Sequence, residues 1–151
     1  MVAVIPPVLA LAIGHAATPY GWSLLLAAAV VVASLVPLGA ARSRAEFTLA
    51  DLAAPRAMAE RLPAWGQRAN WAHHNSFEAF TLFAPAALLC VITTPLAPPA
   101  LLAAWLHPLL RLAYIAAYLA DRAALRSLCW AGAMVCTGLL YVEGFKMIAL
   151  S

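Results

Sequence analysis

The sequence predicts an all-α integral membrane protein: a single domain over residues 1–151, folded as an up-down bundle of four transmembrane helices. Of its residues, 66% are hydrophobic and 10% are charged, and the mean hydropathy is +0.90. A soluble domain is only about half apolar. Four apolar segments are long enough to cross a bilayer, and most basic residues lie in two of the connections between them. These observations exclude an ordinary soluble protein.

The N-terminal segment, residues 1–19, is apolar and uncharged. Pro6-Pro7 and the sequence Thr18-Pro19-Tyr20-Gly21 leave about ten residues of uninterrupted helix, half of the ~20 that a span needs. The segment lacks the positive start and small-residue cleavage site of a signal peptide. We therefore expect an arm on the membrane surface, with a fifth span as the alternative.

The predicted spans are bounded by aromatic residues, arginines and proline-rich turns. Tyr20 and Trp22 form an interfacial aromatic pair before the first span, and Arg42 follows it. A polar loop over residues 42–67 precedes the second span, an uncharged hairpin precedes the third, and a short turn precedes the fourth. The spans are expected at residues 22–41, 68–93, 100–120 and 126–150.

The basic residues predict the orientation of the bundle. Seven of the nine Lys and Arg residues lie in or beside the 42–67 loop and the turn before residue 126. Loops rich in Lys and Arg stay in the cytoplasm. The many arginines and alanines hint at a bacterial genome. We therefore expect a multi-pass protein of the bacterial inner membrane, with the 42–67 loop in the cytoplasm.

The second span carries a polar stripe into the apolar part of the chain. At about 100° per residue, Arg68, Trp71, Asn75 and Glu78 share one helix face, and His74 flanks it. Glu78 lies roughly 15 Å from the expected start of the span. An ionisable group at that depth is costly and is a candidate for a functional site.

Arg111 lies at a matching depth in the third span, roughly 15 Å from its cytoplasmic end. An unpaired arginine in hydrocarbon costs at least about 2.5–3.5 kcal/mol, so we expect a structural ion pair between Glu78 and Arg111. Arg111 also shares a helix face with Tyr114 and Tyr118. The two polar stripes are expected to line one cavity. The alternative is a network that only fixes helix packing.

The mouth of that cavity is expected to be basic and rich in hydrogen-bond donors, which suits an anionic ligand. Arg126 and Ser127 stand at the start of the fourth span, where free backbone N–H groups and the helix dipole add positive potential. Such a place favours a thiolate over a thiol. The side chains expected around the mouth are Arg42, His74, Asn75, Tyr118 and Arg126.

Two motifs lie along these stripes. The first is Ala72-His73-x-Asn75-x-x-Glu78, and the second is Arg111-x-x-Tyr114-x-x-x-Tyr118 followed by Arg126-Ser127. Their spacing and the four-span layout resemble the MAPEG family, the membrane-associated proteins in eicosanoid and glutathione metabolism, and the sequence around Asn75 looks more like the bacterial branch. The resemblance implies a homotrimer that binds glutathione between neighbouring subunits near the cytoplasmic face.

The resemblance also implies roles for single residues. Arg126 would stabilise the glutathione thiolate and Ser127 would assist it. Trp71 and His74 stand where glutathione-using members place arginines, so two anchors for carboxylates are absent, and Tyr114 stands where the prostaglandin synthase branch has a histidine. The glutathione-binding residues would be Arg42, His74, Asn75, Glu78, Tyr114 and Tyr118.

The expected function is that of a glutathione-dependent transferase or peroxidase acting on lipophilic electrophiles that enter from the bilayer. Its expected partners are itself, membrane lipids and lipophilic small molecules. The alternative is a non-catalytic trimeric membrane protein that binds lipid or belongs to a larger complex. Neither a metal nor haem is expected, because the four histidines do not share one depth and the three cysteines lack ligand spacing. Nucleic acid is not expected, since topology explains the net charge of +3.

Overall fold

The structure is a computed structural model that describes residues 7–46, 48–54 and 57–150, with side chains described from residue 14 onward except that of residue 52. All regular structure in these residues is helical. The helices are α1 (Pro7–Ala33), α2 (Leu35–Arg42), α3 (Ala50–Ala53), the 3₁₀ helix η1 (Ala57–Arg61), α4 (Ala64–Thr93), α5 (Pro98–Leu119) and α6 (Ala123–Ala149).

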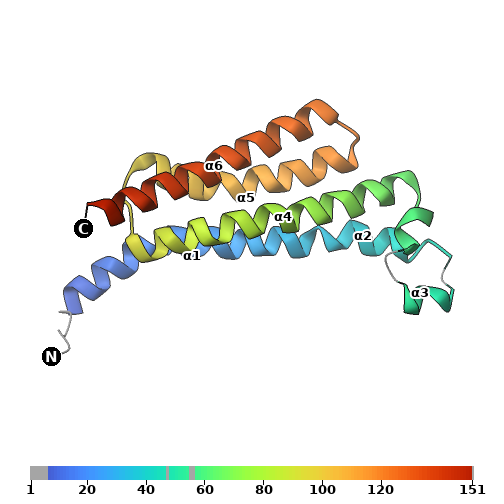
Figure 1. The fold of residues 1–151 in the computed structure, drawn as a ribbon, viewed down its shortest axis with the longest axis horizontal. Coiled ribbons are helices and arrows are strands. Elements are labelled where there is room, and N and C mark those ends of the chain that lie inside the picture. The colour runs from blue at the N-terminus through green and yellow to red at the C-terminus, as the bar shows by residue number, and fades with distance from the viewer. Residues whose placement is uncertain (1–6, 47, 55–56, 151) are drawn as a thin grey trace.

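The long helices form an up-down bundle (Figure 1). The α1–α2 pair runs in one direction, α4 returns beside it, and α5 and α6 form a second antiparallel pair. We call the end that carries the α2–α4 loop and the α5–α6 turn the loop end. The opposite end, with the α4–α5 hairpin and the end of α6, is the hairpin end.

Four helical segments are long and apolar enough to cross a membrane. The predicted all-α membrane bundle of four spans is therefore confirmed. The segments are Gly14–Arg42, Ala64–Thr93, Pro98–Leu119 and Ala123–Ala149.

The expected break at residues 18–21 is wrong. α1 passes through Pro19 without interruption, so residues 7–19 belong to the same helix as the first span. Residues 1–6 lie outside the described part of the chain. The Thr18 hydroxyl donates to the Gly14 carbonyl at 2.8 Å, and such side-chain bonds help spanning helices accommodate proline. In an apolar segment, one missing backbone hydrogen bond costs less than unwinding a turn.

The first span is interrupted at Ser34 instead. Pro37 has no N–H for the carbonyl four residues earlier, and the helix is broken between Ala33 and Leu35. The Ser34 hydroxyl donates to Val31 O at 2.6 Å and lies 2.7 Å from His73 Nδ1 on α4. Because the hydroxyl has one proton, His73 is the donor in the second contact when Val31 receives that proton. The interruption is thereby anchored to α4.

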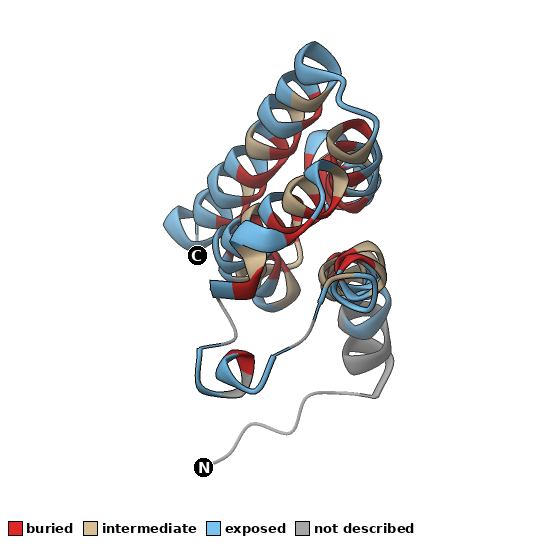
Figure 2. Cartoon of the chain, turned by 90° about the vertical axis from the view of Figure 1, so that its right-hand side faces the viewer, coloured by how far each residue is buried: buried red, intermediate tan, exposed pale blue. Residues whose placement is uncertain are grey.

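The main core lies toward the hairpin end. Buried parts of the long helices face one another across the interior of the bundle (Figure 2). Small side chains allow close helix approach; where Gly144 meets α4, an added Cβ would lie 2.8 Å from Leu89 Cγ. The buried Tyr20 hydroxyl donates to Pro95 O and fixes the hairpin to α1. The buried members of this core are Tyr20, Ala27, Phe83, Ala86, Ala87, Cys90, Ala100, Ala103, Ala104, Cys136 and Leu140.

Candidate functional site

Polar side chains from α4 and α5 meet between the middle of the bundle and the loop end. Arg111 is only 2% exposed. Its Nη2 atom donates to Asn75 Oδ1 at 3.1 Å and to Ser76 Oγ at 3.3 Å. Asn75 Nδ2 in turn donates to Glu78 Oε2 at 3.3 Å. A hydrogen-bonded chain thus leads from a buried guanidinium to an exposed carboxylate.

Glu78 and Arg111 are not in direct contact, so the expected ion pair takes a different form. Among the described residues, salt bridges join Arg61 to Asp51, Arg68 to Asp121 and Lys146 to Glu143. Arg111 faces the side of α4 that carries Ser76, and a helix turns by about 200° over the two residues to Glu78. The Glu78 carboxylate therefore points outward, and Asn75 links it to Arg111.

Ser76 is a member of the site to which sequence analysis gave no role. Its hydroxyl donates to Ala72 O at 2.7 Å, which leaves the oxygen lone pairs free to accept from Arg111. Ser76 is buried, whereas Glu78 is exposed. The available signal was a small polar residue beside Asn75, on the helix face away from the exposed stripe.

Aromatic rings extend the network from Arg111 to α6. The Arg111 guanidinium lies 4.2 Å from the Tyr114 ring centroid, and Tyr114 meets Tyr118 edge-on at 5.5 Å. The Arg126 guanidinium lies 4.7 Å from the Tyr118 centroid, and the Trp71 ring is 6.5 Å from Tyr118. Cation–π contacts of this kind hold an arginine without consuming all its N–H donors. We call the whole set the loop-end cluster: Trp71, Asn75, Ser76, Glu78, Arg111, Tyr114, Tyr118 and Arg126.

Six of the residues selected from the sequence thus come together: Asn75, Glu78, Arg111, Tyr114, Tyr118 and Arg126. Three others make no hydrogen bond, ion pair or ring contact with the cluster in the described chain. Arg42 is exposed at the end of α2, His74 is exposed with its ring 6.1 Å from that of His73, and Ser127 is exposed in the first turns of α6. Their roles in ligand binding stay predictions.

The cluster opens to the outside of the single chain. Glu78 is exposed about 21 Å along α4 from Ala64, which is close to the middle of this helix. Trp71 is 51% exposed, and Arg126 is partly exposed. Charged groups on the outer face of a spanning helix are costly against lipid. This face is therefore expected to be covered by something other than hydrocarbon.

Arg111 retains unused hydrogen-bonding capacity. Its Nε and Nη1 atoms are buried and have no partner within the described residues. Leaving charged donors unpaired costs more than leaving neutral ones unpaired. The interior side of the cluster is thus electropositive.

The start of α6 adds to the positive potential at the loop end. No side chain caps this helix, so its first N–H groups are free of side-chain acceptors. A hollow of about 480 Å³ lies against its first turn, lined by Asp121, Arg122 and residues 123–125. Arg68 on α4 reaches Asp121 at 3.6 Å and ties the α5–α6 turn to α4. Arg126 lies one turn into the helix, where its charge and the helix dipole act in the same direction.

The loop between α2 and α4 has its own ion pair outside the spanning helices. Asp51 is bound by the Arg61 guanidinium, and its Oδ2 accepts from the Thr48 amide at 2.7 Å. The Arg61 hydrogen bond, followed by that of Thr48, holds the pKa of the Asp51 carboxyl below its usual value. Arg44 lies 5.6 Å from the Trp65 ring centroid and joins the loop to α4.

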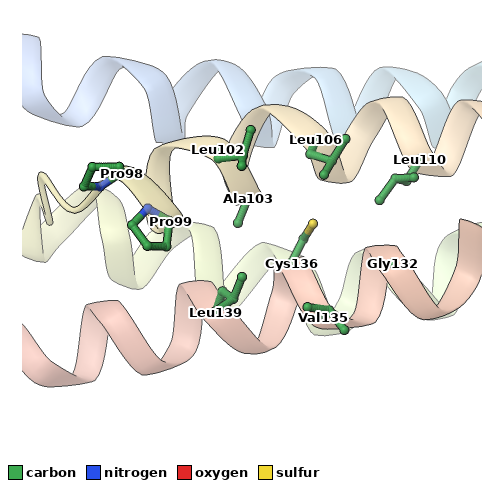
Figure 3. A pocket seen from close by; sticks show the side chains of 10 residues that line it. All are labelled: Pro98, Pro99, Leu102, Ala103, Leu106, Leu110, Gly132, Val135, Cys136 and Leu139. Atoms are coloured by element: carbon green, nitrogen blue, oxygen red, sulfur yellow. The ribbon is translucent and has the colours of Figure 1, made fainter.

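An apolar groove of about 620 Å³ runs between α5 and α6 (Figure 3). Leu102, Leu106 and Leu110 line it from α5, while Val135 and Leu139 line it from α6. One end of the groove is lined by Leu110 and Gly132. Leu110 directly precedes Arg111 in the sequence. At Gly132 an added Cβ would lie 3.0 Å from Leu110 Cδ1, so this glycine keeps the end of the groove narrow.

The histidines are dispersed in space. His107 is buried and stacks on Phe83 with ring centroids 3.7 Å apart, whereas His73 contacts Ser34. Within the described residues, no group of three or more His, Cys, Asp or Glu side chains is placed to hold a metal ion.

Comparison with known proteins gives one match. The family model described as the MAPEG family matches residues 7–145, which is most of the chain and includes every member of the loop-end cluster. No curated protein and no solved structure matches the sequence.

Proposed function

The chain belongs to the MAPEG family of four-helix membrane bundles, and from this premise we propose that it is a glutathione-dependent transferase or peroxidase that acts on lipophilic electrophiles. It is a multi-pass membrane protein. The observation that carries the proposal is the position of Arg126, whose guanidinium lies over the Tyr118 ring at the exposed edge of the loop-end cluster. The Arg126 guanidinium is therefore accessible to a ligand from outside the single chain.

Arg126 would activate the thiol of glutathione. A fixed positive charge beside the sulfur favours the thiolate, which is the nucleophile, and the N-terminus of α6 acts in the same sense. Tyr118 orients Arg126 through the ring contact, so little side-chain reorganisation is needed when the thiolate forms. In the transferase reaction, the thiolate would attack the electrophilic carbon of the second substrate, so that the C–S bond forms as the leaving group departs with the bonding electron pair. In the peroxidase reaction, the thiolate would attack one oxygen of a hydroperoxide, which breaks the O–O bond and gives the sulfenic acid of glutathione and an alkoxide that is protonated to the alcohol. A second glutathione would then reduce the sulfenic acid to glutathione disulfide and water. Ser127 would assist with its hydroxyl.

The same cluster would hold the tripeptide. The amide, carboxylate and phenol groups would come from Asn75, Glu78, Tyr114 and Tyr118. Arg42 and His74, which lie outside the loop-end cluster in the single chain, would add their side chains to the site. Arg111 would act through Asn75, because the hydrogen bond between them fixes the orientation of that amide. Its two unpartnered nitrogen atoms, Nε and Nη1, add positive potential for an anionic ligand.

A homotrimer would complete the site. The exposed Glu78 near the middle of α4 needs a polar partner within the membrane, and a second copy of this chain would cover it. Glutathione would then bind between neighbouring subunits. Native mass spectrometry in mild detergent with lipid retained is expected to give a trimer, and a monomer would contradict this part of the proposal.

The lipophilic electrophile would approach from the bilayer along the apolar groove between α5 and α6. This groove is lined by aliphatic side chains and ends near the level of Arg111. The Gly132→Leu substitution would place a side chain against Leu110 and block the inner end of the groove. In that variant the KM for a long-chain electrophile should rise, while glutathione binding should stay unchanged.

The loop end would face the cytoplasm of a bacterium, across the inner membrane. The arginine-rich connections support this orientation. Single cysteines introduced at Glu46 and Leu96, in a background without native cysteines, should be labelled from opposite sides. Labelling of both positions from one side would contradict the topology.

Titration of glutathione onto the purified protein tests the proposal directly. We expect the ultraviolet absorbance of the thiolate to grow to saturation at one equivalent per site at neutral pH, where free glutathione is mostly a thiol. Addition of a generic electrophile should then discharge this absorbance with formation of the conjugate. No thiolate signal and no turnover with several electrophiles would contradict the proposal.

One observation favours a second candidate, a non-catalytic trimeric membrane protein that binds lipid or belongs to a larger complex. The bonds from Arg111 to Asn75 and Ser76 hold α4 against α5 without any ligand, as a packing contact would. Trp71 and His74 also stand where glutathione-using relatives have arginines. This candidate predicts a stable trimer with neither a thiolate signal nor turnover.

A further inference from the structure

A small hollow lies beside the loop-end cluster, between η1 and the first turns of α4. Its volume is about 120 Å³, roughly four times the ~30 Å³ that one water occupies in the liquid. A single functional group fits, whereas a whole tripeptide does not. The residues that line the hollow are Ala59, Glu60, Gln67, Asn70 and Trp71.

Hydrogen-bond acceptors dominate the polar lining. Gln67 Nε2 donates to the carbonyls of Leu62 at 3.1 Å and Glu60 at 3.4 Å, so the oxygen of this amide is left for a ligand. Asn70 is 8% exposed, and its side chain makes no hydrogen bond within the described chain, although it lines the hollow. Its amide atoms are not among the buried polar atoms without a partner, so they stay accessible to a ligand in the hollow.

Charge makes the hollow suitable for a cation. Among the described residues, the two nearest arginines in sequence have their own acids: Arg61 binds Asp51, and Arg68 lies 3.6 Å from Asp121. Glu60 lines the hollow and takes part in none of the ion pairs among the described residues, so it is the acidic residue there without a described cationic partner. An aromatic ring beside a carboxylate is the combination that recognises ammonium groups.

We infer that the hollow binds an organic ammonium group, with the Glu60 carboxylate as counter-ion and with the Trp71 ring and the Gln67 and Asn70 amides around it. The Trp71 ring also lies near the Tyr118 ring, and the Arg126 guanidinium lies over the Tyr118 ring. A ligand with its ammonium group in the hollow would therefore extend past Trp71 toward the arginine. The class of ligand is a zwitterion with a cationic head and an anionic or thiolate group at the other end.

Two sources carry this chemistry. The amino group of the thiol co-substrate is the source if the proposed function holds, and this assignment rests on it. The ethanolamine headgroup of a membrane lipid is the other source. The two are separated by blocking the amine of the thiol and by changing the lipid.

The hollow itself is tested with methylammonium as the probe. In the purified full-length protein, the Trp71 indole N–H resonance, assigned by its loss in Trp71→Phe, should shift saturably with methylammonium chloride but not with sodium chloride. Glu60→Gln should weaken the apparent affinity about fivefold, the upper range for one exposed charge contact. Glu46→Gln removes an exposed acid of the same loop and should have no effect. An absent or non-saturable shift, or equal weakening by both variants, would overturn the inference.

The source is tested by competition. If the thiol fills the hollow, glutathione should displace methylammonium, and N-acetylglutathione, whose amine is blocked, should not. If a lipid fills it, nanodiscs of phosphatidylethanolamine should abolish the methylammonium response and nanodiscs of phosphatidylglycerol should preserve it. If glutathione does not bind the protein at all, the proposed function is contradicted. The methylammonium response separately tests whether the hollow binds an ammonium group. Displacement by both thiols equally would overturn the assignment to the amine.

Discussion

The hairpin end and the loop end of the same helices are built differently. At the hairpin end, α1, α4, α5 and α6 meet through alanines, cysteines and a few large apolar side chains. Its ion pair, Glu143 with Lys146 at 2.7 Å, lies within one helix. At the loop end, the contacts between helices involve arginines, tyrosines and Asn75, and several donors have no partner in the described chain.

Under the proposed function, this difference assigns stability mainly to the close-packed apolar contacts and ligand binding to the loop-end cluster. Close packing of small residues is the main source of helix association in a membrane. Buried polar groups that are only partly satisfied are costly, so the loop-end cluster that holds them is a candidate functional site. Substitutions in the close-packed apolar contacts should therefore change the melting temperature, and those in the loop-end cluster should change ligand binding under the proposed function.

The largest loss of stability is expected for Leu140→Ala in the hairpin-end core. Leu140 is fully buried, and removing its side chain leaves a cavity that costs about 2–5 kcal/mol in soluble proteins. Glutathione affinity of the folded fraction should stay unchanged. Leu128→Ala, at a residue that is 70% exposed, is the control and should change stability by less than about 0.5 kcal/mol. Equal effects on thermal unfolding in detergent would contradict the assignment of the core.

Gly66→Ala should lower stability by about 1–3 kcal/mol through overpacking. An added Cβ would lie 2.7 Å from the Cβ of Ala41 and 3.2 Å from that of Leu62, and neither atom can rotate away. Gly138 has nothing within 4 Å of an added Cβ, so Gly138→Ala should gain up to about 1 kcal/mol from helix propensity. Two glycine variants with the same melting temperature would rule out the close approach of α2 and α4.

A double-mutant cycle distinguishes the Asn75-bridged arrangement from a direct ion pair. Asn75→Ala and Arg111→Met should couple by about 1 kcal/mol, because one hydrogen bond joins the two side chains. Glu78→Gln and Arg111→Met should couple less strongly, since the carboxylate and the guanidinium are hydrogen-bonded only through Asn75. Strong coupling between Glu78 and Arg111 together with additivity for Asn75 would restore the ion pair.

The smallest effect is expected at Asp51, which binds Arg61 in the exposed loop. The pKa of this carboxyl is lowered, so the ordering it gives the loop is present above its unfolded pKa of about 3.9. That ordering is lost as the pH falls through the lower folded value. The Thr48 amide resonance should titrate with a midpoint below 3.9, and Asp51→Asn should abolish the titration without changing glutathione binding. A midpoint at or above 3.9 would mean that the ion pair does not form in solution.

Sequence reasoning predicted the fold better than it predicted helix boundaries. Apolar length and the uneven distribution of arginines were enough for four spans. The break expected at Pro19 was wrong because rules for proline come from helices whose ends can be hydrated, and the middle of an apolar segment offers no such ends.

At the site, periodicity correctly placed Arg111, Tyr114 and Tyr118 on one face of α5, where they contact one another or Arg126 in the structure. It could not give the rotation of α4 against α5. Sequence spacing defines the faces of one helix, whereas packing decides which face meets a neighbour. Ser76 therefore occupies the position next to Arg111 that Glu78 was expected to hold.

The central claim is that the loop-end cluster, through Arg126, binds glutathione and stabilises its thiolate. Thiolate absorbance of bound glutathione, measured on wild type, Arg126→Ala and Lys146→Ala, tests it most directly. Lys146→Ala removes one cation at the hairpin end and serves as the matched control. We predict that Arg126→Ala loses the thiolate signal with an unchanged melting temperature and oligomeric state, that Arg126→Lys recovers part of it because a flexible ammonium lacks the planar fork, and that Lys146→Ala keeps it in full. A full thiolate signal in Arg126→Ala would contradict the claim.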